Sequence, residues 1–160
     1  MLIGCNSNQI FKEKLNKIEC PEIFFSKEHK ILIQNNENLI SLDNISIKSE
    51  INNAKFDKSC SLQNNNFLSN LSVLFVVKPL IQLDHKIELP YYVAFIGDEN
   101  DILDIQYFST VGEFKKNIET KKLIETDLIS SNKILFKNPS KNFSVVIGFM
   151  LDKKQLEIIN

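Results

Sequence analysis

The chain has 160 residues, of which 43% are hydrophobic, a size and composition typical of one globular domain with a substantial core. Its 19 basic residues, all of them lysines, and its 20 acidic residues give a formal net charge of -1 and are spread along the whole length. This pattern excludes a basic stripe that follows phosphates, and so nucleic acid as a partner, and it excludes recognition that depends on arginine.

The N-terminal segment, residues 1–19, is polar and weakly patterned after Cys5, and we expect it to be a tether leading into one domain of residues 20–160. Residues 2–5, Leu-Ile-Gly-Cys, have the form of a lipobox, in which the cysteine thiol receives a diacylglycerol. A signal peptide also needs a charged start and an apolar core of roughly 7 to 15 residues, which the few residues before Cys5 do not supply. We therefore expect a start site further upstream or a trimmed leader. The alternative is an ordinary cysteine near a chain end.

After the tether, apolar and polar residues alternate with a period of two, which is typical of half-buried β-strands. The alternation is clearest around Ile45, Ile47 and Ile51. Residues 68–77 are apolar on both faces and predict a central strand covered on both sides, which Pro79 ends. This run has the length of a strand, so we expect no transmembrane helix in the chain as given.

Pro90 opens a further predicted strand, residues 91–96. The turn-forming residues 97–101 separate this strand from a second apolar run at 102–108, which predicts an antiparallel hairpin. Residues 118–129 alternate less cleanly and give a weaker strand signal.

Residues 143–149 alternate well and predict another strand, after which Asp152 is placed to cap a short helical turn through Gln155 and Leu156. Short strands about ten residues apart, without a long helical pattern, are typical of a sandwich. The sequence therefore predicts an all-β, antiparallel β-sandwich of about seven strands, with an N-terminal tether and a short C-terminal helical turn.

Three cysteines are an odd number, which in an exported protein requires one pair and one thiol with another fate. If Cys5 carries lipid, Cys20 and Cys60 remain to pair in an oxidising compartment, and closing that loop stabilises the fold by about 4 kcal/mol. The alternative is two buried free thiols in a cytosolic protein. Neither cysteine has the spacing of a metal ligand.

The two histidines, His29 and His85, stand far apart in lysine-flanked segments typical of solvated loops, so the sequence does not indicate a catalytic triad. The four glycines are scattered and form no phosphate-binding loop, which excludes a nucleotide partner. We therefore expect no catalytic residues, no cofactor and no enzymatic activity.

An acidic turn formed by Asp98, Glu99, Asn100 and Asp101, followed by Asp104, places several oxygen ligands close together. It lacks the spacing of a calcium motif, so we expect solvated turn residues and no bound metal. An exposed loop of this kind is suited to contact with a partner.

Tyr91, Tyr92 and Tyr107 would form a carbohydrate-binding platform if they faced outward. Their alternating positions on strands favour a place in the core instead.

Several landmarks follow one another in a characteristic order: Cys20-Pro21, Cys60, the segment LPYYVA at 89–94, Phe108, and the segment VIGFML at 146–151 followed by Gln155-Leu156. In this order the chain resembles a family of small lipoproteins of alphaproteobacteria, over most of its length after the tether. The resemblance implies an exported, acylated, immunoglobulin-like or fibronectin-like β domain in which Cys20 and Cys60 are bridged, and it supplies no catalytic residues. The richness in lysine and asparagine departs from the family and fits a low-GC member.

These observations predict a lipid-anchored, non-catalytic protein of the bacterial cell envelope, on the periplasmic face of the inner or outer membrane. The membrane is its first partner, through lipid on Cys5. We expect it to bind another envelope protein or a cell-wall component through a strand edge or the loop at 98–101. Two alternatives are an accessory subunit of a larger membrane-associated assembly, and a carbohydrate-binding or enzymatic domain with a site built from distant loops.

Overall fold

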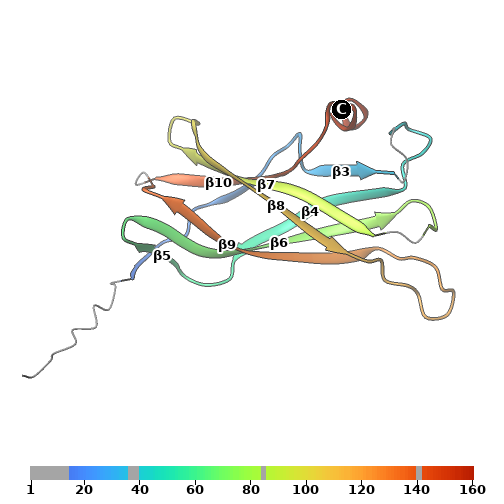
Figure 1. Ribbon diagram of the computed structural model, residues 1–160, viewed down its shortest axis with the longest axis horizontal. Helices are drawn as coiled ribbons and strands as arrows, with labels where there is room; N and C mark the ends of the chain where they lie inside the picture. Colours follow the sequence, from blue (N-terminus) through green and yellow to red (C-terminus); the bar gives the residue numbers. More distant parts are fainter. Residues whose placement is uncertain (1–14, 36–39, 84–85, 140–141) are drawn as a thin grey trace, which may run out of the picture.

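The computed structural model describes residues 15–35, 40–83, 86–139 and 142–160. Strands make up most of this chain and form two sheets packed face to face, with one short helix near the C-terminus (Figure 1). The all-β sandwich expected from the sequence is confirmed. No helix in the described ranges is long and apolar enough to cross a membrane.

The larger sheet has six strands. They are β1 (Asn16–Ile18), β3 (Ile31–Gln34), β4 (Ile47–Phe56), β5 (Cys60–Gln63), β6 (Asn66–Pro79) and β9 (Thr126–Lys137). The strands β1, β5, β6, β4 and β3 follow one another, and β9 pairs with β6 in antiparallel register. The strand predicted at 68–77 is thus central in its sheet, with β9 on one edge and β4 and β5 on the other.

The smaller sheet has four strands, in the order β2 (Ile23–Phe25), β10 (Phe143–Phe149), β7 (Ile87–Gly97) and β8 (Ile102–Gly112). The predicted hairpin is confirmed as the antiparallel pair β7 and β8. The expected antiparallel pattern has one exception, because β2 runs parallel to β10. The chain from β3 to β9 lies between these two strands, which is ample length for the return to the same end of the sheet that parallel pairing requires.

The structure contains ten strands, whereas the sequence predicts about seven. The weak strand signal at 118–129 is only partly right, since β9 begins at Thr126 and residues 118–125 belong to the connection from β8. The additional strands β1, β2, β3 and β5 have only three or four residues each, too few for alternation to be recognised. One of them, β1, lies within residues 1–19, which the sequence assigns to the tether, and pairs with β5. The larger sheet therefore begins before Cys20.

The strand expected around Ile45 to Ile51 is β4, in which Ile47, Ser49 and Ile51 point inward. The outer face of β6 corrects a second expectation. Leu74 and Val76 are only half-buried, because no further layer covers this face of the larger sheet. The strand is central within its sheet but is covered fully on one side only.

Pro90 lies inside β7 rather than at its start. Its carbonyl oxygen accepts a hydrogen bond from Met150 N at 3.0 Å, on the side of β7 that faces β10. The Pro90 nitrogen points to the same side as its carbonyl. On that side the hydrogen-bonded ladder with β10 ends at Tyr91 and Phe149, one residue away. Proline is tolerated because no partner strand needs its missing N–H.

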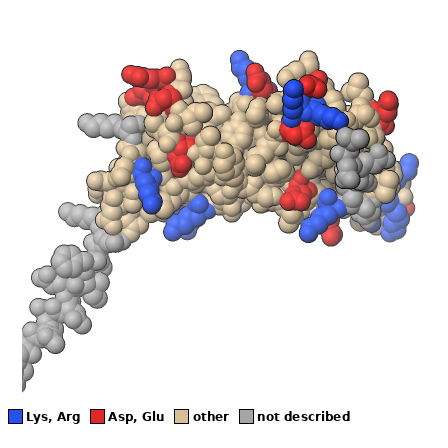
Figure 2. All heavy atoms as spheres, turned by 45° about the horizontal axis from the view of Figure 1, so that its top comes forward, with Lys and Arg blue, Asp and Glu red and all other residues tan. Residues whose placement is uncertain are grey.

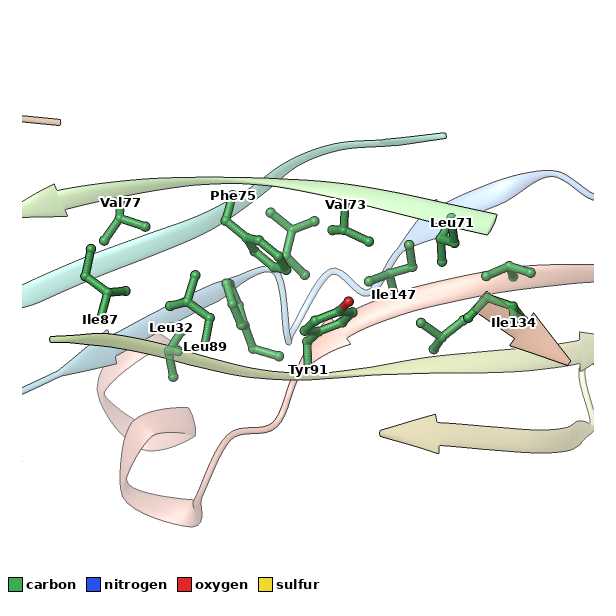
Figure 3. Close-up of a cluster of buried hydrophobic side chains, with 14 of the residues drawn as sticks. Leu32, Leu71, Val73, Phe75, Val77, Ile87, Leu89, Tyr91, Ile134 and Ile147 are labelled. Carbon is green, nitrogen blue, oxygen red and sulfur yellow. The ribbon is translucent and has the colours of Figure 1, made fainter. Parts of the chain in front are cut away.

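The core fills the space between the two sheets with side chains from both (Figure 3). One buried polar group, the Tyr91 hydroxyl, joins the two sheets across the core. The Tyr91 hydroxyl on β7 donates to Ser130 Oγ on β9 at 2.9 Å and accepts from Asn132 Nδ2 at 2.7 Å. Burial raises the pKa of the Tyr91 hydroxyl above its usual value, and these two hydrogen bonds partly offset that rise. The hydroxyl therefore stays neutral and links the sheets.

The helix α1 (Lys153–Ile159) begins as the sequence predicts. Asp152 Oδ1 accepts from Gln155 N at 2.8 Å, and Gln155 Oε1 accepts from Asp152 N at 2.8 Å, which together form a capping box. The Gln155 amide also donates to the carbonyl of Ile33 on β3, at 2.9 Å. The same side chain thus starts the helix and satisfies a carbonyl on an edge strand of the larger sheet.

A second glutamine, Gln106, links the two sheets on the side of the sandwich opposite Gln155. Gln106 on β8 donates through Nε2 to the carbonyl of Leu135 on β9, at 2.7 Å. Both β8 and β9 are long edge strands, and such edges are sites where another chain can pair. The Gln106 side chain on this carbonyl therefore hinders an incoming strand from pairing there.

Replacing Ser49 by alanine should stabilise the fold. Within the described residues, Ser49 Oγ is buried and has no hydrogen-bond partner, so its desolvation is uncompensated. We expect the Ser49→Ala variant to gain about 1 kcal/mol in the free energy of unfolding, measured by urea denaturation. Ser46→Ala is the matched control, since Ser46 Oγ donates to Gln34 O at 3.1 Å and its loss should destabilise. Equal losses in both variants would contradict this account.

Candidate binding surface

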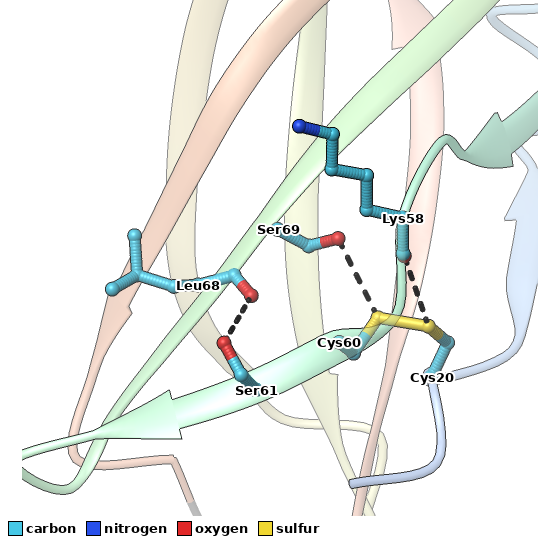
Figure 4. Close-up of a disulfide and its surroundings, with 6 residues drawn as sticks. All are labelled: Cys20, Lys58, Cys60, Ser61, Leu68 and Ser69. Carbon is cyan, nitrogen blue, oxygen red and sulfur yellow. Dashed lines mark hydrogen bonds between the residues drawn. A yellow bond between two sulfur atoms is a disulfide. The ribbon is translucent and has the colours of Figure 1, made fainter. Parts of the chain in front are cut away.

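Cys20 and Cys60 form a disulfide, with 5.1 Å between their Cα atoms. Cys60 is the first residue of β5, and Cys20 lies between β1 and β2, where the chain passes from the larger sheet to the smaller one (Figure 4). Cys60 Sγ is buried, with Ser69 Oγ 3.6 Å away. The pairing implied by the sequence is confirmed, and the bond fixes the crossing segment to the larger sheet.

An open groove of about 810 Å³ lies beside this disulfide. Four chain segments build it: the crossing segment with β2, Leu62 of β5, the β7–β8 turn, and the β9–β10 connection with the start of β10. Besides Pro21 and Pro139, its apolar lining includes Ile18, Phe24, Leu62, Ile96 and Phe143. Half of the Phe24 side chain is exposed although aromatic residues are usually buried, so this wall presents apolar surface to solvent.

Among the residues that the structure describes, the charged side chains in this lining are Glu19, Glu22 and Asp98, and all three are exposed carboxylates. The described residues form ion pairs elsewhere, between Lys30 and Glu50 and between Lys78 and Glu125, which contain none of these three. The groove therefore combines an apolar floor with a negatively charged rim.

The predicted contact loop Asp98, Glu99, Asn100 and Asp101 forms the exposed tip of the β7–β8 hairpin. Gly97 N donates to Asp101 O at 2.9 Å, and Asn100 N donates to Gly97 O at 3.0 Å. Asn100 adopts a φ of 62°, a left-handed conformation that asparagine tolerates. The turn is thus held by its own backbone, and Asp98 and Asn100 line the groove.

The acidic turn does not assemble a metal site. Among the residues that the structure describes, no three histidine, cysteine, aspartate or glutamate side chains come together in a way that could hold an ion. The hairpin carboxylates project into solvent, as expected for turn residues.

The outer face of the smaller sheet carries a second, shallower hollow of about 370 Å³. Its lining is uncharged: Tyr92, Ala94, Ile96, Ile102, Ile105, Tyr107 and Val146. Tyr92 and Tyr107 are register partners across β7 and β8, as are Ala94 and Ile105. Two of these side chains are largely exposed, Ile102 at 64% and Tyr107 at 63%. This face is an apolar surface without a covering layer.

Tyr92 lies across a glycine on the neighbouring strand. A Cβ atom at Gly148 would stand 2.5 Å from Tyr92 Oη, so the absence of a side chain makes room for the tyrosine. The His29 ring meets the Tyr92 ring edge to face, with 5.7 Å between centroids. His29 Nδ1 donates to the carbonyl of Phe149 at 3.2 Å. His29 is half-buried and held in place, contrary to the expectation of a solvated loop histidine.

The three tyrosines have different roles. Tyr91 belongs to the core, as the alternation favours, while Tyr92 is half-buried and Tyr107 is exposed on the outer face. Cys5 and His85 lie outside the described residues, so the structure places neither. The groove itself was not predicted from the sequence, although the acidic turn marked the correct end of the sandwich.

Comparisons with protein-family models, with curated proteins and with solved structures find no match to this chain. The resemblance to alphaproteobacterial lipoproteins stays a prediction that depends on its motifs.

The contact between Gly148 and Tyr92 predicts a coupled pair of substitutions. Gly148 has no positive φ, so alanine fits its backbone, and the cost of Gly148→Ala comes mainly from the clash with Tyr92, with His29 Cβ 2.9 Å away as a second close neighbour. We expect a loss of roughly 1–3 kcal/mol in unfolding free energy in the parent protein, and a smaller loss when Tyr92→Ala is already present. Chemical denaturation of the four proteins of this cycle tests it. An identical loss in both backgrounds would refute the coupling.

The disulfide should dominate the stability of the N-terminal half. The two cysteines are 40 residues apart, and opening a loop of that size costs about 4 kcal/mol in the chain-entropy account. We expect the double variant Cys20→Ser, Cys60→Ser to lose a free energy of unfolding of this order in urea. The parent protein unfolded under reducing conditions is the control, since it lacks the bond but keeps both side chains, and it should show a similar loss. A double variant as stable as the parent would show that the bond contributes nothing to the fold.

Proposed function

We propose that this protein is a lipid-anchored, non-catalytic module of the bacterial cell envelope. In this proposal it is held on the periplasmic face of the inner or outer membrane through Cys5, and its sandwich binds another envelope protein. The observation that carries the proposal is the disulfide between Cys20 and Cys60. Disulfides persist in oxidising compartments such as the periplasm and are rare where thioredoxin and glutathione keep thiols reduced.

The lipobox at residues 2–5 supplies the proposed anchor. Burial of an acyl chain contributes about 0.8 kcal/mol for each methylene, and a single chain binds a membrane only marginally. The diacylglycerol that the lipobox cysteine receives supplies two chains, and two hydrophobic anchors hold a protein stably. The third cysteine then has a role that is separate from the disulfide pair.

The outer face of the smaller sheet supports the binding part of the proposal. It joins an apolar hollow to a groove with an acidic rim, and apolar patches rimmed by polar residues are common at protein interfaces. The exposed hairpin of residues 98–101 lies at the edge of this face, where the sequence already indicates a contact loop.

A second candidate function is that of a permanent accessory subunit in a membrane-associated assembly. The exposed Ile102 and Tyr107 favour it, since a stable subunit buries such side chains against its neighbours. Purification from native membranes distinguishes the two functions. A permanent subunit stays with its partners through mild detergent, whereas a transient binding module is recovered alone.

Replacing the lipobox cysteine tests the anchor. We expect the parent protein, expressed with a leader in a bacterial host, to enter the detergent phase on Triton X-114 partitioning, and the Cys5→Ala variant to stay in the aqueous phase. Intact mass should show a cleaved, acylated N-terminus in the parent only. Ser7→Ala is the matched control and should behave as the parent does. Recovery of Cys5→Ala in the membrane fraction, or an unmodified Met1 in the parent, would exclude acylation.

A further inference from the structure

We propose that the groove and the hollow act as one docking surface for a partner-protein segment in which apolar side chains are followed by lysine or arginine. We use the term docking surface for the two linings described above, from Tyr107 to Glu19. The inference deepens the proposed function, on which it rests, by giving the chemistry of the partner.

The two depressions are continuous. Ile96 lines both of them, from the end of β7. Across the sheet, Val146 of the hollow is the register partner of Phe24 of the groove. A single extended segment can therefore contact both parts without leaving the surface of the smaller sheet.

The hollow selects apolar side chains. Its seven lining residues include no charged group, and Ala94 at its centre is almost fully buried beneath larger neighbours. Covering exposed Ile102 and Tyr107 removes apolar surface from water, which stabilises a complex by about 25 cal/mol for each square ångström buried. The tyrosine hydroxyls leave a polar border, which is usual at protein interfaces.

The groove selects positive charge. Among the described residues of its lining, the charged side chains are Glu19, Glu22 and Asp98, and Glu99 and Asp101 extend the acidic region along the hairpin. Figure 2 shows a group of acidic side chains at one end of the molecule, beside a broad area without charged groups. Each exposed pair contributes only about 0–1 kcal/mol, but several carboxylates of one sign attract a cationic segment and orient it.

Other occupants fit less well. An acidic peptide or a nucleic acid would meet charge of its own sign at the rim, and an entirely apolar chain would leave the three carboxylates without a counter-charge. A segment that is apolar at one end and basic at the other satisfies both parts of the surface. Its orientation follows, with the basic end at the disulfide and the apolar end over Tyr92 and Tyr107.

The proposed anchor limits where the partner can lie. Ile18, which lines the groove, is 13 residues after Cys5 in the sequence, and a fully extended chain of that length spans at most roughly 45 Å. A protein acylated at Cys5 therefore presents this groove close to the membrane surface. The partner segment would belong to a membrane protein or to a protein held near the same membrane.

Two synthetic peptides test the proposal on the full chain labelled with nitrogen-15. Both have three apolar residues alternating with serine, and one ends in two lysines whereas the other ends in two glutamates. We expect the lysine peptide to shift the amide signals of Ile96, Asp98 and Tyr107 and to bind at least about tenfold more tightly than the glutamate peptide. Its affinity should fall as salt is raised.

Substitutions then assign the two parts of the surface. The double variant Glu22→Gln, Asp98→Asn should weaken binding of the lysine peptide roughly fivefold, and Tyr107→Ser should weaken both peptides. Glu125→Gln, just before β9 and paired with Lys78 on the larger sheet, is the matched control and should leave affinity unchanged. The peptide comparison on the unmodified protein remains decisive if a variant does not fold.

Equal binding of the two peptides, signal changes centred on Lys78 and Glu125, or no binding at millimolar peptide would each overturn the docking surface. The test needs no lipid, so it separates the two proposals. A protein that binds the lysine peptide but fails the Cys5→Ala partitioning test keeps the docking surface and loses the anchor. The reverse result keeps the anchor and loses this partner chemistry.

Discussion

The bond between Cys20 and Cys60 is the constraint on which the N-terminal half of this sandwich depends. The chain leaves the larger sheet after β1 and joins the smaller sheet as β2, and each of these strands has only three residues. Pairing over so short a length provides little stability of its own. The disulfide holds the crossing segment at the start of β5, and from there β2 can lie parallel to β10 with Phe24 facing outward. The apolar wall of the groove is a consequence of that covalent attachment.

A polar residue in the core also fixes how parts of the sandwich lie relative to one another. Tyr91 packs against Phe75 and Phe108, with ring centroids 5.1 and 5.5 Å away, and its hydroxyl reaches Ser130 and Asn132 on the facing sheet. Because hydrogen bonds depend on direction, this contact specifies how the two sheets lie relative to each other, which apolar packing alone does less strictly.

Long strands with one wet face could be predicted from the sequence, and β4, the β7–β8 hairpin and β10 follow from alternation of apolar side chains. β9 has 12 residues, but only its first four fall within the weak strand signal at 118–129. Its inward positions include Ser130 and Asn132, which are polar because they meet the Tyr91 hydroxyl, so the apolar period is interrupted at its centre. The weak signal for this strand and the buried polar link therefore have one cause.

The candidate binding surface could not be predicted from the sequence, for a different reason. Cys20, Ile96 and Phe143 come from distant parts of the chain, and the pairing of β10 with both β2 and β7 brings them together. The acidic hairpin was visible in the sequence because turn residues are local signals. Its position beside an apolar wall depends on tertiary contacts that no local pattern encodes.

The glutamines at the sheet edges affect whether neighbouring copies of this protein can pair edge to edge. An anchored population diffuses in two dimensions, where neighbours meet often and with their sides aligned. In a sandwich with open edges, such encounters favour strand-to-strand growth into filaments. Here Gln155 and Gln106 occupy carbonyls on β3 and β9 at opposite sides of the molecule. If the protein is anchored as proposed, these side chains would hinder pairing of neighbouring copies at both edges, and the outer face of the smaller sheet would stay open to a different molecule.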